Sequence, residues 1–369
     1  MEFNIDRSTF LESVQKTLGI VERKSTMPIL NNLLLKTGDD QITVVATDRE
    51  VGLVATYEAD VVTQGDITIA ARKLYEMIRE IQGERVNVKK LDNNWMNVTC
   101  GKMEFRLPGI PAVDFPDVSE EEGVVYSRIK SGMLREMINK TYFAISTDEM
   151  RISLNGVFLK IERGAIEMVA TDGHRLSIVK MPLDDGADID IGSGGIIIPR
   201  KGVGEMRKLL EDEDGIVDIG IKTGVCILKK NNTILKMSLI DSDYPDYEKV
   251  IPTEKGVELV VNKEDMLHSL RRMGVISSDR FSGVKIQINN NKMVLSSTNT
   301  DIGEAHDEVD VIYSGKEFEV GYNVKYLIDA VDVVDEKEIS FEMRESQGPA
   351  IVREAGNDSF KCIIMPLRL

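Results

Sequence analysis

The chain of 369 residues carries 46 Lys and Arg against 62 Asp and Glu, a formal net charge of −16. Its hydrophobic content of 42% is ordinary for a globular protein and suffices for the cores of two or three domains. No apolar run reaches the roughly 20 residues that cross a bilayer, and the polar alternation that begins at Met1 is not a signal peptide. We expect a cytoplasmic protein without a membrane segment. Taken alone, the acidic charge disfavours nucleic acid as a partner.

The cysteines argue against two further classes of protein. Cys100, Cys226 and Cys362 lie far apart in the sequence and form no Cys-x-x-Cys pair. An odd number of isolated cysteines fits neither a disulfide framework nor a zinc site. We therefore expect small buried side chains in a reducing compartment.

A short motif recurs three times along the chain. It reads Val-Val-Ala-Thr-Asp-Arg-Glu at 44–50, Met-Val-Ala-Thr-Asp-Gly-His at 168–174, and more weakly Leu-Ser-Ser-Thr-Asn-Thr-Asp at 295–301. The aligned threonines are Thr47, Thr171 and Thr298, which are 124 and 127 residues apart. A period of this length predicts three homologous units, provided that other elements recur with it.

The other elements do recur, in the same order in each unit. Apolar residues at helical spacing predict a first helix, two alternating runs joined by turn residues predict a strand pair, and a second helix pattern follows. In chain order we predict helix 8–19, strands 29–36 and 41–46, and a helix from Ala71; helix 131–142, strands 153–161 and 165–170, and a helix from Pro199; helix 263–276, strands 283–288 and 292–297, and a helix from Tyr322. A closing strand and turn are predicted at Phe115-Pro116-Asp117 and Tyr244-Pro245-Asp246, and the third unit closes with 360–369.

This content predicts an α+β protein of three repeated domains, 1–125, 126–254 and 255–369. In each domain, two helices would be flanked by antiparallel sheets. Exposed sheet edges must be paired, covered or charged. Three copies that pair edge to edge would form an arc, and an arc that closes with a second copy of the chain leaves no free edge.

A set of short motifs, in order along essentially the whole chain, carries a family resemblance. The motifs are Met27–Leu30, Ala70–Lys73, Ala170–Leu176, Ile198–Gly202, Tyr244–Tyr247, Gly321–Val324 and Met365–Leu369. With them the sequence resembles the β subunit of bacterial DNA polymerase III, the sliding clamp. The resemblance implies a DNA clamp fold that closes as a homodimeric ring of six domains around double-stranded DNA. It implies a processivity factor for DNA replication, with no active site and no cofactor.

The predicted helices are more basic than the rest of the chain. Six helix segments sum to +4, which leaves −20 for the other residues. Such an offset suits helices that face phosphates without reading base sequence, although basic residues are also common on solvated helix faces. The DNA-facing candidates are Lys24, Arg72, Lys73, Arg200, Lys201 and Lys285, with Lys24, by the resemblance, in a loop that approaches DNA. At Thr147-Asp148-Glu149 the chain departs from relatives with neutral polar residues, which weakens the case for a DNA contact by that loop.

The residues that could support an enzyme or a metal site do not fit one. Asp172, His174 and Ser177 lie in one local segment, whereas a catalytic triad converges from separate segments. His268 and His306 each have an acid one turn away but no evident third ligand. The phosphate-binding patterns GxxxxGK[ST] and GxGxxG are absent. We therefore predict no catalytic residue and no metal.

By the same resemblance, a groove between the second and third domains docks the polymerase III catalytic subunit, the clamp loader, and other polymerases and repair factors through short hydrophobic peptide motifs. Met, Leu and Pro around a few polar groups suit such a site, although core packing would explain part of the same positions. The pocket residues would be Leu154, Thr171, Gly173, His174, Arg175, Leu176, Pro245 and Val250, with Arg151 at the rim, and, from the third domain, Tyr322, Asn323, Tyr326, Ile363, Met365, Pro366 and Leu367.

Apolar pairs in the first and last repeats predict the dimer contact. Phe105 and Leu107 of one copy would meet Val275 and Ile276 of the other, since no intrachain repeat covers them. Two alternatives remain open: a triplicated protein-interaction scaffold that does not encircle DNA, and a carbohydrate- or nucleotide-processing enzyme. Only a ring would be retained on closed circular DNA and released from linear DNA.

Overall fold

The computed structural model describes residues 1–22, 26–118, 122–162, 164–183, 194–212, 215–278, 282–313, 315–344 and 348–368. These residues form two compact units. The first unit contains residues 1–132 and 204–239, and the second contains 133–183, 194–203 and 240–368. Each unit is built on one 13-stranded sheet whose neighbouring strands are antiparallel.

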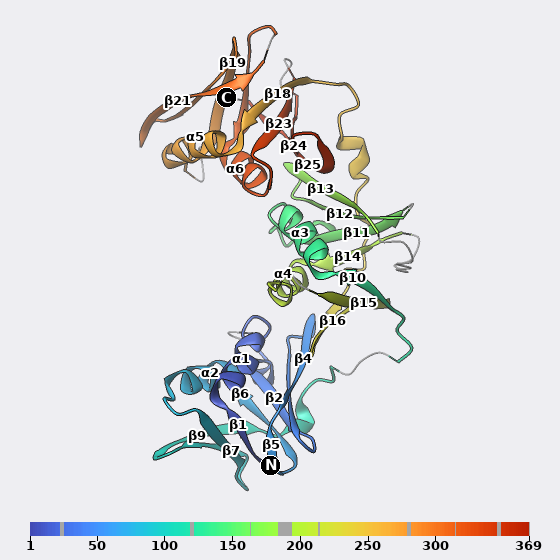
Figure 1. The fold of residues 1–369 in the computed structure, drawn as a ribbon, viewed down its shortest axis with the longest axis vertical. Coiled ribbons are helices and arrows are strands. Elements are labelled where there is room, and N and C mark those ends of the chain that lie inside the picture. Colours follow the sequence, from blue (N-terminus) through green and yellow to red (C-terminus); the bar gives the residue numbers. More distant parts are fainter. Residues whose placement is uncertain are drawn as a thin grey trace. The chain divides into compact units, whose positions relative to one another are not determined.

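The sheet of the first unit has the order β10-β15-β16-β17-β4-β3-β2-β6-β9-β8-β7-β1-β5. Helices α1 (Arg7–Thr17) and α2 (Ala71–Glu80) pack against each other, and α1 also contacts β3 and β4 (Figure 1). The strands are β1 (Glu2–Asp6), β2 (Asn32–Thr37), β3 (Gln41–Thr47), β4 (Val51–Glu58), β5 (Asp60–Thr63), β6 (Gly65–Ala70), β7 (Arg85–Lys90), β8 (Trp95–Cys100), β9 (Met103–Ile110), β10 (Tyr126–Lys130), β15 (Ile216–Lys222), β16 (Val225–Lys230) and β17 (Thr233–Ser238).

The sheet of the second unit has the order β14-β11-β12-β13-β25-β24-β23-β18-β21-β20-β19-β22-β26. Helices α5 (Lys263–Ile276) and α6 (Val324–Asp332) lie side by side (Figure 1), whereas α3 (Ser131–Tyr142) and α4 (Arg200–Leu209) have residues in both units. The strands are β11 (Gly156–Glu162), β12 (Ala165–Thr171), β13 (Arg175–Pro182), β14 (Ile196–Pro199), β18 (Val257–Asn262), β19 (Gly283–Asn289), β20 (Lys292–Asn299), β21 (Gly303–Ile312), β22 (Phe318–Asn323), β23 (Glu338–Met343), β24 (Ala350–Glu354), β25 (Asn357–Ile364) and β26 (Pro366–Leu367).

Two strand pairings join the repeats edge to edge, as predicted. In the first unit, β17 pairs with β4, from Thr233 opposite Ala55 to Met237 opposite Val51. In the second unit, β13 pairs with β25, from Arg175 opposite Ile364 to Val179 opposite Phe360. Because each pairing satisfies backbone groups that would otherwise be exposed, these seams remove sheet edges that could template aggregation.

Several predicted element boundaries were wrong next to prolines and polar turns. The strand predicted at 29–36 begins only at Asn32, as β2, because Pro28–Asn31 forms a 3-10 helix. The predicted closing strands at Phe115–Asp117 and Tyr244–Asp246 are irregular chain beside short 3-10 helices, Ala112–Asp114 and Tyr247–Val250. Proline has no N–H for a sheet ladder, so these segments turn instead of pairing.

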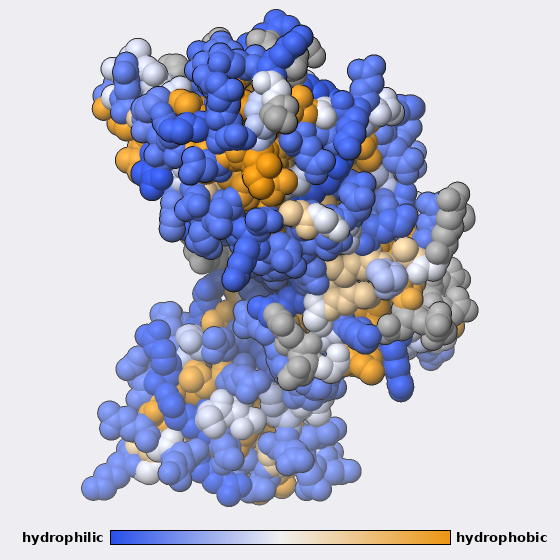
Figure 2. Space-filling model, turned by 45° about the horizontal axis from the view of Figure 1, so that its top comes forward, coloured by the Kyte–Doolittle hydropathy of each residue, from blue (hydrophilic) through white to orange (hydrophobic). Residues whose placement is uncertain are grey.

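The core of both units is mainly aliphatic, as the low aromatic content predicted, with a few large aromatic side chains. Among the larger wholly buried side chains are Phe3 and Phe10, whose rings meet edge to face at 6.0 Å. The face in view in Figure 2 is mostly hydrophilic, with separate hydrophobic patches. In the described part of the chain, no helix is long and apolar enough to cross a membrane.

A buried ion cluster lies between α3 and the third repeat. Lys140 is 2% exposed. Its ammonium lies 2.6 Å from carboxylates of both Glu136 and Glu354, and Glu354 is itself 4% exposed. Burial alone would lower the pKa of Lys140, but hydrogen bonds to the two carboxylates outweigh it and raise the pKa. The stabilisation is therefore complete below the ordinary lysine pKa and disappears only as the pH rises through the raised value.

We predict that Lys140→Met lowers the free energy of unfolding by about 3–5 kcal/mol, because Glu354 would be left buried without its cation. The control is Lys16→Met, which changes the residue 124 positions earlier in the first repeat. Lys16 pairs with Glu12 at 2.9 Å at a partly exposed site, so its removal should cost less than about 1 kcal/mol. Urea denaturation measures both variants. Equal decreases would contradict the assignment of a buried cluster.

Candidate functional site

A cavity of about 230 Å³ opens in the second unit where β12, β13, the chain before β18 and the C-terminal strands meet. Its wall is mainly apolar, with a few polar groups from the turn between β12 and β13. The lining residues are Leu154, Thr171, Gly173, His174, Arg175, Leu176, Pro245, Asp246, Tyr247, Val250, Ile363 and Met365.

The floor of the cavity is a buried cluster that includes Leu176, Tyr247 and Ile363. Phe158 and Tyr244 pack against this cluster, with their rings stacked at 4.9 Å and 10°. Such contacts between segments distant in sequence give the cavity a preformed hydrophobic base.

A polar network fastens Tyr247, and with it the chain that forms one wall. The Tyr247 hydroxyl donates to Glu167, and the Lys160 ammonium lies over the Tyr247 ring at 5.1 Å and 3.0 Å from Glu248. Burial, and then the hydrogen bond to Glu167, raises the pKa of Tyr247, so the phenol stays protonated as a donor. The wall is therefore tied to the sheet at two successive residues.

The opposite wall is a tight turn set by Asp172. Its Oδ1 accepts from the backbone N–H groups of His174 and Arg175, at 2.9 and 3.0 Å. Gly173 has φ +86°, and a Cβ there would lie 2.6 Å from the Arg151 guanidinium. The positive φ favours glycine at this position, although Arg49, 124 residues earlier in the first repeat, adopts φ 80°. The Arg151 guanidinium is the end of a half-exposed side chain, so it can move aside and does not by itself require glycine. The His174 carbonyl accepts from the N–H of Met365, which ties the C-terminal segment to the turn.

The structure brings ten of the predicted pocket residues to this cavity. Tyr326 lies close by, its ring 6.4 Å from that of His174, and Arg151 donates to the Asp172 carbonyl beside Gly173. The other predicted residues do not line it: Tyr322 is wholly buried and donates to the Gly348 carbonyl, Asn323 caps α6, and Pro366 and Leu367 form β26. Sequence reasoning missed Asp246 and Tyr247, although the Tyr-Pro-Asp-Tyr motif at 244–247 contains both.

A catalytic triad does not form at this turn. The Ser177 side chain is wholly buried and donates to the Lys140 carbonyl, away from His174. The Asp172 carboxylate binds backbone N–H groups and the Arg175 guanidinium, so it does not orient an imidazole. Geometry therefore offers no activated nucleophile among these residues.

The predicted DNA-facing residues differ in their burial and in their polar partners. Lys24 lies outside the described residues. Arg200 is half-buried over the Tyr142 ring and donates to the Ile145 carbonyl, whereas Lys73 is exposed and pairs with Glu76 at 2.7 Å. Lys201 lies on α4 and is half-buried. Lys285 is exposed on strand β19 and pairs with Glu319.

The 147–149 loop, whose DNA contact the sequence put in doubt, carries an ion pair: the Asp148 carboxylate lies 3.4 Å from Arg151.

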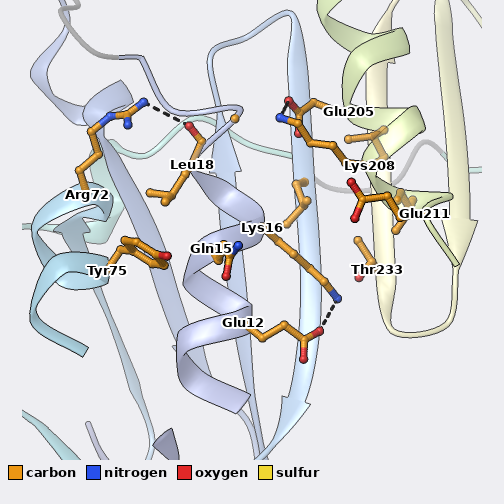
Figure 3. Close-up of a pocket in the computed structure, with 14 residues that line it drawn as sticks. Glu12, Gln15, Lys16, Leu18, Arg72, Tyr75, Glu205, Lys208, Glu211 and Thr233 are labelled. Atoms are coloured by element: carbon orange, nitrogen blue, oxygen red, sulfur yellow. Dashed lines mark hydrogen bonds and ion pairs between the residues drawn. The ribbon is translucent and has the colours of Figure 1, made fainter. Parts of the chain in front are cut away.

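Arg72 lines a second, larger cavity of about 720 Å³ in the first unit, between α1, α2 and α4 (Figure 3). Its guanidinium turns to the Leu18 carbonyl at 3.2 Å. The cavity reaches Gly19, beside which the side chains of Glu205 and Lys208 lie. Acidic and basic side chains line this cavity in equal number: Glu12, Glu205 and Glu211 against Lys16, Arg72 and Lys208. Two of the pairs are ion pairs, Lys16 with Glu12 at 2.9 Å and Lys208 with Glu205 at 2.7 Å.

The predicted dimer residues lie beside two strands that have a neighbour on only one side over part of their length, among the described strands. These unpaired stretches are termed half-open edges. Phe105 and Leu107 are half-buried on β9, whose residues 103–108 pair with β8 on one side only among the described strands. Strand β21 likewise pairs with β20 along 303–310 and meets β18 only at Val311 and Ile312. At the end of α5, Val275 is 74% exposed.

Three repeats joined edge to edge, each with a pair of helices, define the fold class as a DNA clamp. Family models of the DNA polymerase III beta subunit match the chain throughout: the N-terminal domain at 1–119, the central domain at 128–246 and the C-terminal domain at 248–368. The chain therefore belongs to the family of the DNA polymerase III beta subunit. This family consists of sliding clamps, which are non-enzymatic processivity factors of DNA replication.

Individual relatives agree with this family. The Beta sliding clamp of Pseudomonas aeruginosa is 32% identical over 373 residues, and that of Escherichia coli is 29% identical over 371, with 100% of both chains covered. Among solved structures, the Pseudomonas aeruginosa clamp with ligand has a TM-score of 0.92 at 32% identity. A Bartonella birtlesii clamp bound to griselimycin has 0.94 at 31%, and both matches cover 100% of each chain.

Proposed function

We propose that two copies of this chain close head to tail into a ring that encircles duplex DNA in the cytoplasm. The domain boundaries would be those predicted, 1–125, 126–254 and 255–369. The half-open edges of β9 and β21 carry the proposal. Each is flanked by apolar side chains, Phe105 and Leu107 on one and Val275 and Ile276 near the other. Pairing of β9 with the β21 of the second copy would remove both edges at once.

The DNA contacts of this ring would be made by Lys24, Arg72, Lys73, Arg200, Lys201 and Lys285. Support comes from the location of four of them on helices α2 and α4 and from the basic balance of the helix segments. Side chains that touch only phosphates hold the duplex without fixing the protein at one base sequence, because the phosphates are the same at every position along the DNA. The ring could therefore slide along DNA of any sequence.

Charge reversal at Lys73 should weaken DNA retention and flatten its salt dependence. Since each protomer of a dimer would make one phosphate interaction fewer, the slope of log K against log [salt] should fall by about two. The matched control is Lys292→Glu on β20. Lys292 is also exposed and also pairs with one carboxylate at 2.7 Å, that of Glu308. Salt titration by fluorescence anisotropy measures both, and an equal effect in both variants would remove Lys73 from the DNA-facing set.

The cavity beneath the Asp172 turn would dock client proteins. We propose that it takes a short hydrophobic peptide segment of the polymerase III catalytic subunit, the clamp loader, and other polymerases and repair factors. Its preformed apolar floor and a volume near 230 Å³ suit one or two aliphatic side chains. The polar groups at the turn would orient the peptide backbone.

Retention on circular DNA tests the ring itself. Protein loaded on nicked circular DNA should stay bound through gel filtration and should leave once the DNA is cut to a linear form. A scaffold that does not encircle DNA would be indifferent to the cut. Release without cutting, or retention after it, would contradict the ring.

A further inference from the structure

Arg175 lines the docking cavity, yet the groups that hold its guanidinium lie outside the lining of that cavity. It donates from Nη1 to the Asp329 carboxylate and from Nη2 to the Phe143 carbonyl, both at 2.5 Å. The guanidinium also lies over the Phe143 and Tyr326 rings, at 5.1 and 4.5 Å. The Arg175 side chain is 10% exposed and that of Asp329 is 41% exposed, so charge-assisted and cation–π contacts hold a largely buried guanidinium whose Asp329 partner is open to solvent.

Strand geometry explains why neighbouring residues have different roles. Side chains alternate across a strand, so Arg175 and Leu176 point to opposite faces of β13. Leu176 packs with Tyr247 and Ile363 in the floor of the cavity, whereas Arg175 reaches α6 and the end of α3. One short segment thus links the docking cavity to the helix layer behind it.

The link continues from Arg175 into the turn. Its Nε donates to Asp172 Oδ2 at 3.0 Å, while Oδ1 of the same carboxylate accepts the two N–H groups that shape the turn. The His174 carbonyl at this turn accepts from Met365. A change in the direction of the Arg175 guanidinium would therefore reorient Asp172, and with it both walls that meet at His174.

We propose that Asp329 is a positioning residue for the docking cavity, acting through Arg175 and Asp172. Asp329 lies on α6 and does not line the cavity. Its carboxylate fixes Nη1 of Arg175, so Nε stays aligned on Asp172 and the turn keeps the shape that presents His174 and receives Met365. The inference rests on the proposed peptide-docking function of this cavity.

The test compares Asp329→Asn with Asp332→Asn. Both variants remove one negative charge from α6, but Asp332 is 55% exposed and pairs at 2.9 Å with Arg271, away from the cavity. The probe is a fluorescein-labelled pentapeptide with leucine and phenylalanine side chains, titrated by anisotropy well below the melting temperature. We expect about tenfold weaker binding for Asp329→Asn, the usual scale of a charge-assisted hydrogen bond, and unchanged binding for Asp332→Asn. Equal affinity of wild type and Asp329→Asn would overturn the inference.

Two further readouts separate positioning from a general collapse of structure. Asp329→Glu retains the carboxylate and should bind the peptide more tightly than Asp329→Asn. Backbone amide resonances of His174 and Leu176 should shift in Asp329→Asn and not in Asp332→Asn. A glutamate variant no better than the asparagine variant, or unmoved resonances, would overturn the inference. If wild type itself does not bind the peptide, the docking function fails, which is a different result from equal binding by wild type and variant.

Discussion

Deleting residues 365–369 is expected to remove peptide binding while the protein stays folded and dimeric. Met365 lines the cavity and donates its N–H to the His174 carbonyl. Its deletion therefore removes one wall of the cavity and one hydrogen bond that holds the turn. Binding of a short anchored peptide depends on a few contacts, and removing such a wall should cost about 2 kcal/mol or more, roughly thirtyfold in affinity.

The structure also predicts that this deletion spares the core. It removes β26, which pairs with β22 only at Gly321 and Tyr322, while β22 keeps its long pairing with β19. Buried strand β25 ends at Ile364, before the cut. Calorimetry should therefore show a small shift in melting temperature. Removing only residues 368–369 is the control and should leave peptide affinity unchanged. Full affinity after the longer deletion would disprove the docking assignment, whatever the change in stability.

Combining Leu107→Asp with Ile276→Ala is expected to convert the dimer into monomers. The contact we propose has apolar side chains at its centre, and a buried carboxylate without a partner is strongly unfavourable there. Dimer affinity should fall by at least about a hundredfold, equivalent to about 3 kcal/mol. Analytical ultracentrifugation measures the mass at micromolar concentration, and the same variant should no longer be retained on circular DNA.

A matched control is Val113→Asp, which introduces the same charge at an apolar residue that is 88% exposed and outside the proposed contact. It should remain dimeric. A double variant that still sediments as a dimer would show that β9 and the end of α5 are not the interface. A monomeric double variant with intact thermal stability and intact peptide binding would confine the effect to assembly.

Local features were predictable from the sequence because they depend on near neighbours. The helix patterns at 131–142 and 263–276 and the turn motif at Thr171–Arg175 follow from spacing and turn chemistry within a short window. The repeat is recognisable because such local motifs recur 124 residues apart. The family resemblance rests on the same local motifs and led to ten residues of the cavity. Predictions failed at short proline-containing segments such as Phe115–Asp117, which is irregular chain and not a strand, because proline has no N–H for a sheet ladder.

The tertiary structure alone decided how those local pieces act together. The pairings of β17 with β4 and of β13 with β25 join residues far apart in the chain, and no periodicity encodes which edges meet. The direction of the Arg175 side chain toward Asp329 and the attachment of Arg200 to Ile145 are likewise long-range contacts. The sequence by itself determined which elements form and which motif they carry, because propensity and pattern are local properties. Packing decided which face of a strand such as β13 lines the docking cavity and which face packs against the helices. Burial depends on partners that only the fold brings together.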